Sequence, residues 1–322
     1  MKYRRIPRMD LEVSEIGLGT WGMGGKWWGP TDDAESIRAI HRAMDLGVNL
    51  FDTAYTYGDG HSERILAEAF RRKGRRGFVA TKIPPMNREW PARHDVEAGK
   101  VFPGQWIRAC TERSLLNLET DCLDLQQLHV WSDSWLGKGD WEEAVRDLKE
   151  AGKIRFFGVS INDHDPDSAL RIVASGLADA VQVIYNIFDQ SPERRLFSAC
   201  REKGIGVIVR VPLDEGGLSG ALTAATTFAE EDFRRDYFGG GRLAETVRRA
   251  ENLRFLIRRE IRTLPQGALK FCLGHPAVST VIPGMRTRAH VEENCAASDG
   301  VPLGPEEIDR LRAHAWERNF YG

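Results

Sequence analysis

The chain has 322 residues, of which 42% are hydrophobic and 29% are charged, a balance that excludes disordered, collagen-like and low-complexity proteins. Its 45 Lys and Arg residues nearly equal its 47 Asp and Glu residues, so the formal net charge is −2 and no overall positive field attracts nucleic acid or an anionic membrane. A chain of this length forms either about two average domains or one α/β barrel.

Two short segments near the N-terminus, residues 3–6 and 11–13, flank a turn at Met9 and Asp10 and predict a β-hairpin that caps the bottom of the fold. After them, β-branched runs alternate with amphipathic helical stretches, as in βαβ units around a parallel sheet. Eight such runs without a break in composition predict a single (β/α)8 TIM barrel that spans residues 1–322 as one domain. The expected barrel strands are residues 13–18, 48–52, 78–82, 123–129, 154–160, 180–186, 206–211 and 280–283.

Helical periodicity between these strands predicts helices at residues 32–46, 62–72, 105–116 and 141–151. Connections that are too long for plain βα turns follow three of the strands. Because loops after strands lie at the carboxyl-terminal face of a barrel, where barrel enzymes place their sites, we expect the functional site there. These long loops are residues 83–104, 130–140 and 212–242.

Polar residues end several of the expected strands, and parallel strand ends meet at one mouth of a barrel. Asp52, Lys82 and His129 end three consecutive strands, and Tyr57 follows Asp52 on the next loop. A phenol is a poor proton donor near neutral pH unless its anion is stabilised, which a nearby ammonium does. We therefore expect Tyr57 as general acid, Lys82 as the group that tunes it, Asp52 as the anchor of Lys82, and His129 as a hydrogen-bond partner of a carbonyl oxygen.

Several short motifs resemble the aldo-keto reductase family in order and position along nearly the whole chain. They are residues 16–21 (IGLGTW), 51–58 (FDTAYTYG), 80–82 (ATK), 125–129 (LQQLH), 154–160 (IRFFGVS), 281–284 (VIPG) and 293–294 (EN). The resemblance implies that Asp52, Tyr57, Lys82 and His129 form the family's catalytic tetrad. It implies NADPH-dependent reduction of an aldehyde or ketone to an alcohol, since no side chain supplies a hydride.

The resemblance further implies that NADPH/NADP+ lies across the barrel mouth without a Rossmann domain, in keeping with the absence of a G-x-G-x-x-G motif after an early strand. Ser160 and Gln182 match the residues that hold the nicotinamide carboxamide, and the segment after the eighth strand matches the one around the adenosine phosphate. A guanidinium suits such a phosphate. The expected cofactor residues are Thr20, Trp21, Ser160, Asn162, Gln182, Arg210, Pro212, Leu213, Gly284, Arg286, His290, Glu293 and Asn294.

Two positions depart from the family pattern. Asn162 stands one residue later than the family's Asn, because Ile161 intervenes after Ser160. Arg210 stands near the end of strand seven, where many members have an aromatic residue that stacks on the nicotinamide. A cation there disfavours the oxidised, positively charged ring, while a guanidinium aimed at phosphate or substrate is an equal alternative, so the role of Arg210 stays open.

Six tryptophans fall on the expected mouth-side loops, and aromatic walls suit an apolar or sugar-like carbonyl compound. Some of them pack the loops onto the barrel. The expected substrate contacts are Trp21, Trp28 and Trp131.

Two other functions remain open at this point. Lys82 as a Schiff-base nucleophile would make the protein an aldolase, although that requires an unpaired amine and Asp52 argues against it. Alternatively, some relatives of the family are cofactor-binding regulatory subunits of membrane channels, and an intact tetrad permits that role.

The five cysteines lie in apolar segments without a CxxC pair or His neighbours at ligand spacing, which predicts reduced thiols and no metal site. The basic N-terminal residues lead into Asp10 and Glu12 rather than into an apolar segment, and no apolar run is long enough to cross a bilayer. We expect a cytoplasmic protein with a small-molecule aldehyde or ketone substrate and neither nucleic acid nor membrane as partner. The oligomeric state, the physiological substrate and the direction of the reaction stay open.

Overall fold

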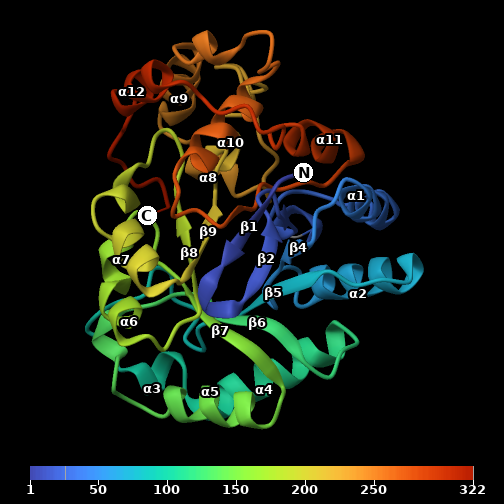
Figure 1. Ribbon diagram of the computed structural model, residues 1–322, viewed down its shortest axis with the longest axis vertical. Coiled ribbons are helices and arrows are strands. Elements are labelled where there is room, and N and C mark those ends of the chain that lie inside the picture. Colours follow the sequence, from blue (N-terminus) through green and yellow to red (C-terminus); the bar gives the residue numbers. More distant parts are fainter. Residues whose placement is uncertain (26, 322) are drawn as a thin grey trace.

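A parallel eight-stranded sheet forms the centre of the computed structural model, which describes residues 1–25 and 27–321 (Figure 1). The strands follow one another in chain order, and bridges between Ile16 and Val281 and between Gly19 and Gly284 join the first strand to the last. The sheet therefore closes on itself, and the predicted (β/α)8 barrel is confirmed. Its strands are β3 (Leu18–Gly19), β4 (Leu50–Asp52), β5 (Phe78–Ile83), β6 (Leu123–Leu128), β7 (Ile154–Ser160), β8 (Ala180–Ile184), β9 (Gly206–Arg210) and β10 (Thr280–Val281).

The predicted N-terminal hairpin is also confirmed. β1 (Tyr3–Ile6) pairs antiparallel with β2 (Leu11–Ser14), and Asp10 closes the turn in the left-handed conformation, with φ of 46°. Ile6 and Val13 are fully buried against residues at the bottom of the barrel. Val13 thus belongs to the hairpin, so the first barrel strand, predicted at residues 13–18, is shortened to Leu18–Gly19.

Helices surround the barrel, with their apolar faces against the strands (Figure 1). Asp32 begins the first of them, because its carboxylate accepts the backbone N–H of Glu35 at 3.1 Å. The four predicted helices are all present. The helices are α1 (Asp33–Asp45), α2 (His61–Lys73), α3 (Ala98–Val101), α4 (Gly104–Asn117), α5 (Trp141–Glu150), α6 (Leu170–Ser175), α7 (Leu196–Lys203), α8 (Arg234–Tyr237), α9 (Arg242–Glu251), α10 (Leu264–Gly274), α11 (Arg288–Cys295) and α12 (Pro305–Arg312).

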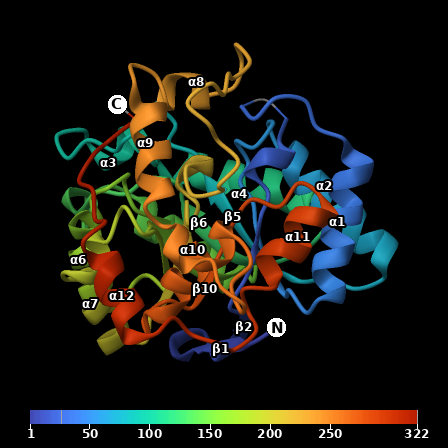
Figure 2. The same cartoon turned by 90° about the horizontal axis from the view of Figure 1, so that it is seen from above.

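The long loops after the strands lie at the end of the barrel opposite the hairpin. Figure 2 shows α3 and α8, which belong to two of these loops, at one end and β1 and β2 at the other. The C-terminus lies at the same end as the loops (Figure 2). The strand ends that carry the predicted site residues therefore open toward the loops and the C-terminal segment.

The described part of the chain has neither a membrane-spanning helix nor a cluster of metal ligands. No helix in residues 1–25 and 27–321 is both long and apolar enough to cross a bilayer. Within the same residues, no group of three or more His, Cys, Asp or Glu side chains is arranged to hold a metal ion.

Candidate active site

Lys82 lies at the centre of the barrel mouth with its side chain fully buried. It is the next-to-last residue of β5, and its Nζ donates to Asp52 Oδ1 at 2.6 Å, to the carbonyl of Thr53 at 2.8 Å and to Tyr57 Oη at 3.3 Å. These three acceptors use the three protons of an ammonium. The lysine is therefore held as a charged donor between the carboxylate and the phenol.

Asp52 ends β4, and both oxygens of its carboxylate have partners. Oδ1 accepts from Lys82, and Oδ2 accepts from Nε2 of Gln182 on β8 at 2.7 Å. The backbone carbonyl of Asp52 accepts the Thr20 hydroxyl at 2.9 Å and the Thr20 N–H at 3.0 Å. Contacts from β5, from β8 and from Thr20 after β3 thus fix Asp52, and Asp52 in turn fixes Lys82.

Tyr57 lies on the loop between β4 and α2, half-buried beside Trp21. The two rings stack with centroids 6.2 Å apart, and the His129 ring stands at a steep angle to the phenol at 5.9 Å. Gly24 lets the Trp21 loop approach closely, since a Cβ there would lie 2.7 Å from the carbonyl carbon of Tyr57. The structure therefore brings the four predicted tetrad residues together.

The charge states of the tetrad follow from burial and from one another. Burial raises the pKa of Tyr57, and the charge of Lys82 offsets this only in part, so the phenol holds its proton at neutral pH. Lys82 thus lowers the pKa of Tyr57, as expected from the sequence, but burial has the larger effect. Burial opposes the charged form of Lys82, but the charges and hydrogen bonds of Asp52 and Tyr57 together outweigh it and raise the pKa of Lys82.

His129 follows directly after β6 and is uncharged at neutral pH. Burial, followed by the charges of Lys82 and Arg210, holds the pKa of His129 well below its ordinary value. A neutral imidazole has one N–H to donate. Its Nδ1 lies 3.4 Å from the Thr56 hydroxyl, and Trp90 stands perpendicular to the ring at 5.8 Å.

Trp90 is one of the six tryptophans expected on mouth-side loops, although it was not among the expected substrate contacts, and Phe233 was not singled out from the sequence. Trp90 belongs to the 83–104 loop, and Phe233 reaches Trp21 from the 212–242 loop with centroids 4.8 Å apart. The sequence does not show which loop residues reach the mouth, because the path of a long loop over the mouth depends on tertiary packing.

Among the residues expected around the nicotinamide, Ser160 and Gln182 lie side by side, whereas the side chain of Asn162 is already hydrogen-bonded to another loop. Ser160 is buried at the end of β7, and its register partner on β8 is Gln182. The side-chain amide of Asn162 donates to the carbonyl of Ala92 and accepts the Ala92 N–H, each at 2.9 Å. Asn162 therefore fastens the 83–104 loop in this structure.

Arg210 ends β9, beside the start of the 212–242 loop. Its Nη2 donates to the carbonyl of Ile161 at 3.0 Å and pairs with Asp163 at 2.5 Å. Pro212 is buried and Leu213 is half-buried behind it. Val211, between Arg210 and Pro212, has a left-handed backbone with φ of 53°.

The segment after β10 lies across from the Trp21 loop. Gly284 is exposed, with open space where a side chain would stand. Arg286 is half-buried and donates from Nη1 to the carbonyl of Trp28 at 2.9 Å. The His290 N–H donates to the Thr287 hydroxyl that caps α11. Within α11, the Glu293 carbonyl accepts from Gln266, and Asn294 is buried.

The three predicted substrate tryptophans separate into two groups. Trp21 and Trp28 pack edge to face with centroids 5.5 Å apart, next to Tyr57 and Phe233 at the mouth. Trp131 is 0% exposed. It packs against Trp135 and Trp141, and its indole N–H donates to Asp133.

The predicted substrate role of Trp131 is therefore corrected to a packing role. The apolar side chains of Trp135 and α5 draw the loop after β6 onto the outside of the barrel.

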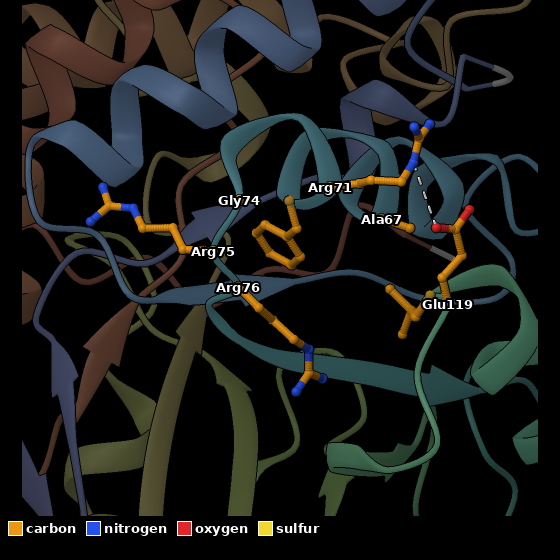
Figure 3. A pocket seen from close by; sticks show the side chains of 8 residues that line it. Ala67, Arg71, Gly74, Arg75, Arg76 and Glu119 are labelled. Carbon is orange, nitrogen blue, oxygen red and sulfur yellow. Dashed lines mark ion pairs between the residues drawn. The ribbon is translucent and has the colours of Figure 1, made fainter.

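A hollow of about 360 Å³ lies away from the mouth, where residues 74–76 lead into β5 (Figure 3). Three arginines line it, but each one already has an acidic partner. Arg71 faces Glu119 at 3.8 Å, as Figure 3 shows. The other two pairs are Arg75 with Asp45 and Arg76 with Asp124. These charges are satisfied within the chain, so this hollow is not a candidate for the chemistry.

Comparison with known proteins gives consistent matches. The sequence profile of the Aldo/keto reductase family matches residues 15–315. Aldo-keto reductase YhdN of Bacillus subtilis (strain 168) is 35% identical over 240 residues, 73% of this chain and 69% of that protein. The NADH-specific methylglyoxal reductase of Escherichia coli (strain K12) is 29% identical over 332 residues, 99% of this chain and 100% of that protein. The structure of an aldo/keto reductase from Klebsiella pneumoniae in complex with NADP and acetate has a TM-score of 0.68 at 26% identity, covering 99% of this chain and 98% of the other.

Proposed function

This chain belongs to the aldo/keto reductase family of oxidoreductases, and we propose that it uses NADPH to reduce an aldehyde or ketone to an alcohol, with Tyr57 as the proton donor. The observation that carries the proposal is the buried chain of contacts from Asp52 through Lys82 to Tyr57, at 2.6 and 3.3 Å. A carboxylate, an ammonium and a neutral phenol in this order form an acid that can protonate an oxygen as it gains charge.

The residues at the mouth fit a dinucleotide. Trp28 Nε1 and Arg210 Nε are buried donors with no hydrogen-bond partner among the described residues. Buried donors of this kind are ordinarily satisfied, so a bound ligand with acceptor atoms would complete them. Ser160 and Gln182 would hold the carboxamide of the nicotinamide, and Arg286 would hold the 2′-phosphate with the N–H groups that Trp28 does not use.

When bound, NADPH supplies a hydride to the carbonyl carbon of the substrate. His129, as a neutral imidazole, donates its one N–H to the carbonyl oxygen and orients it. Tyr57 Oη gives its proton to that oxygen as negative charge develops. Lys82 stabilises the resulting phenolate, and Asp52 keeps the ammonium in place.

The aldolase alternative is disfavoured by the contacts of Lys82. A Schiff-base lysine needs a neutral, unpaired amine. Here the amine has three partners, and its pKa is raised because Asp52 and Tyr57 together outweigh burial. The regulatory alternative predicts tight cofactor binding with negligible turnover, which separates it from the proposal by experiment.

The test is a titration of the purified protein with NADPH and with NADH, followed by quenching of tryptophan fluorescence. Trp21 and Trp28 lie at the mouth, so saturable quenching is expected, with tighter binding of NADPH. Oxidation of NADPH by a panel of aldehydes and ketones then measures turnover. Binding of neither nucleotide would refute the proposal, and binding without turnover of any carbonyl compound would favour the regulatory role. Tighter binding of NADH would refute the assignment of Arg286.

A further inference from the structure

Arg210 is a nearly buried cation whose partners occupy only one edge of the guanidinium. Its side chain is 20% exposed, and Nη2 alone carries the contacts with Ile161 and Asp163. Nε is buried and has no partner among the described residues. Because Asp163 and the Ile161 carbonyl already occupy Nη2, Arg210 is not free to grip a phosphate or a substrate carboxylate with both terminal nitrogens. Of the roles that the sequence left open for Arg210, this geometry therefore favours one exerted by its charge over a bidentate grip.

The C-terminal segment holds the loop that follows Arg210. Tyr321 Oη donates to the buried carboxyl of Glu215, and Arg318 pairs with the buried carboxylate of Asp214. Asp214 and Glu215 both have left-handed backbones, with φ of 52° and 53°, a conformation that persists only where the surroundings fix it. The tail therefore holds the loop after β9 in one arrangement, while Ile161 and Asp163 hold the side chain of Arg210.

The charge of Arg210 reaches the centre of the mouth despite the ion pair with Asp163. It lowers the pKa of Asp52 and of Tyr57, although burial raises both, and it adds to the burial that lowers the pKa of His129. These three groups lie on other strands and loops. A ligand that reacts beside these three groups would experience the electrostatic field of Arg210 as well.

We propose that Arg210 makes the mouth select the reduced over the oxidised cofactor, because its fixed positive charge disfavours the cationic nicotinamide ring of NADP+ relative to the neutral ring of NADPH. This inference rests on the proposed function. The hydride donor and the proton donor Tyr57 must meet at one carbonyl group, so the nicotinamide ring has to lie within the field that Tyr57 senses. Weaker binding of NADP+ than of NADPH favours reduction and product release over the reverse reaction.

The measurement is the ratio of the dissociation constants of NADP+ and NADPH, obtained by fluorescence titration and calorimetry at fixed pH and salt. Arg210→Met, which removes the charge, should lower this ratio on the order of tenfold, the size expected for a unit charge several ångströms away in a partly screened site. Arg210→Lys, which keeps the charge but not the shape, should leave the ratio within about threefold of wild type. Asp163→Asn removes the counter-charge and should raise the ratio.

The opposite signs of Arg210→Met and Asp163→Asn separate a charge effect from damage to the site. An unchanged ratio in both variants would overturn the inference, as would equal losses of affinity for both cofactor forms. If Arg210→Met does not fold, as a thermal melt would reveal, the direction of the Asp163→Asn shift decides alone. Failure of the proposed function is distinct, because it would appear as absence of binding to the wild-type protein.

Discussion

Gln182 donates a 2.7 Å hydrogen bond to Asp52, a residue 130 positions earlier in the chain and across the barrel mouth. This bond satisfies the oxygen of Asp52 that Lys82 does not contact. Gln182, expected from the sequence to touch only the cofactor, therefore also supports the carboxylate on which the position of Lys82 depends. The mouth is one connected hydrogen-bond network rather than separate catalytic and cofactor-binding parts.

Replacing Gln182 by Met should weaken both folding and catalysis. The change leaves a buried carboxylate oxygen without a donor, which costs about 1–3 kcal/mol of unfolding free energy. It also loosens Lys82, so kcat should fall. Chemical unfolding and steady-state kinetics measure the two effects.

The matched control is Gln126→Met, which replaces a buried glutamine on β6 that bonds Thr111. It should lose stability while keeping kcat, and equal kcat for both variants would contradict the network.

Tyr57→Phe should abolish most turnover and spare cofactor binding. The variant lacks only the proton that the carbonyl oxygen receives, and general acid catalysis contributes about 10²–10⁴-fold. The dissociation constant for NADPH should stay within about threefold of wild type, because the stack of the ring on Trp21 is kept. Turnover is followed by oxidation of NADPH.

The control for this loss is Tyr55→Phe. The Tyr55 hydroxyl bonds Arg113 away from the mouth, so its removal should leave kcat near wild type. Retained activity in Tyr57→Phe would remove Tyr57 from the role of acid.

The four tetrad residues could be placed from sequence for a physical reason. Each of them ends a strand or follows one closely, and closure of a barrel brings parallel strand ends to one mouth. The same reasoning fails for residues farther along the loops. Trp131 is only two residues beyond His129, yet it turns outward because Trp135 and Trp141 offer it an apolar surface. The order of the strands does not determine whether a loop side chain turns toward the mouth or outward.

Long-range partners likewise escape a sequence pattern. Asn162 was expected at the nicotinamide, but its amide bonds the backbone of Ala92, 70 positions away. Val13 belongs to the hairpin and not to the first predicted strand, because its side chain closes the bottom of the barrel together with Ile6. In both cases the pattern identified the residue as important and the tertiary packing selected its partner.

Trp90→Ala should raise the KM for apolar carbonyl substrates by about tenfold, the value of one aromatic contact, with a smaller effect on kcat. The ring stands beside His129 and is 45% exposed, so it presents a face to the mouth. Trp131→Phe is the comparison, because its ring is buried. That variant should lower the melting temperature and leave KM unchanged. A rise in KM for Trp131→Phe alone would reverse the assignment of the two residues.

Glu215 should make the stability of the fold depend on pH near neutrality. Burial raises the pKa of its carboxyl from 4.5 to about 7, and the bond from Tyr321 and the charge of Arg210 offset this only in part. Between these two values the folded chain holds a proton that the unfolded chain releases, so stability falls as the pH rises through that window, by up to about 3 kcal/mol.

Glu215→Gln keeps an acceptor for Tyr321 but cannot ionise. Its melting temperature relative to wild type should therefore be higher at pH ~8 than at pH ~5. A difference that is the same at both pH values would mean that Glu215 does not titrate in this window, and that the tail is held in place independently of its charge.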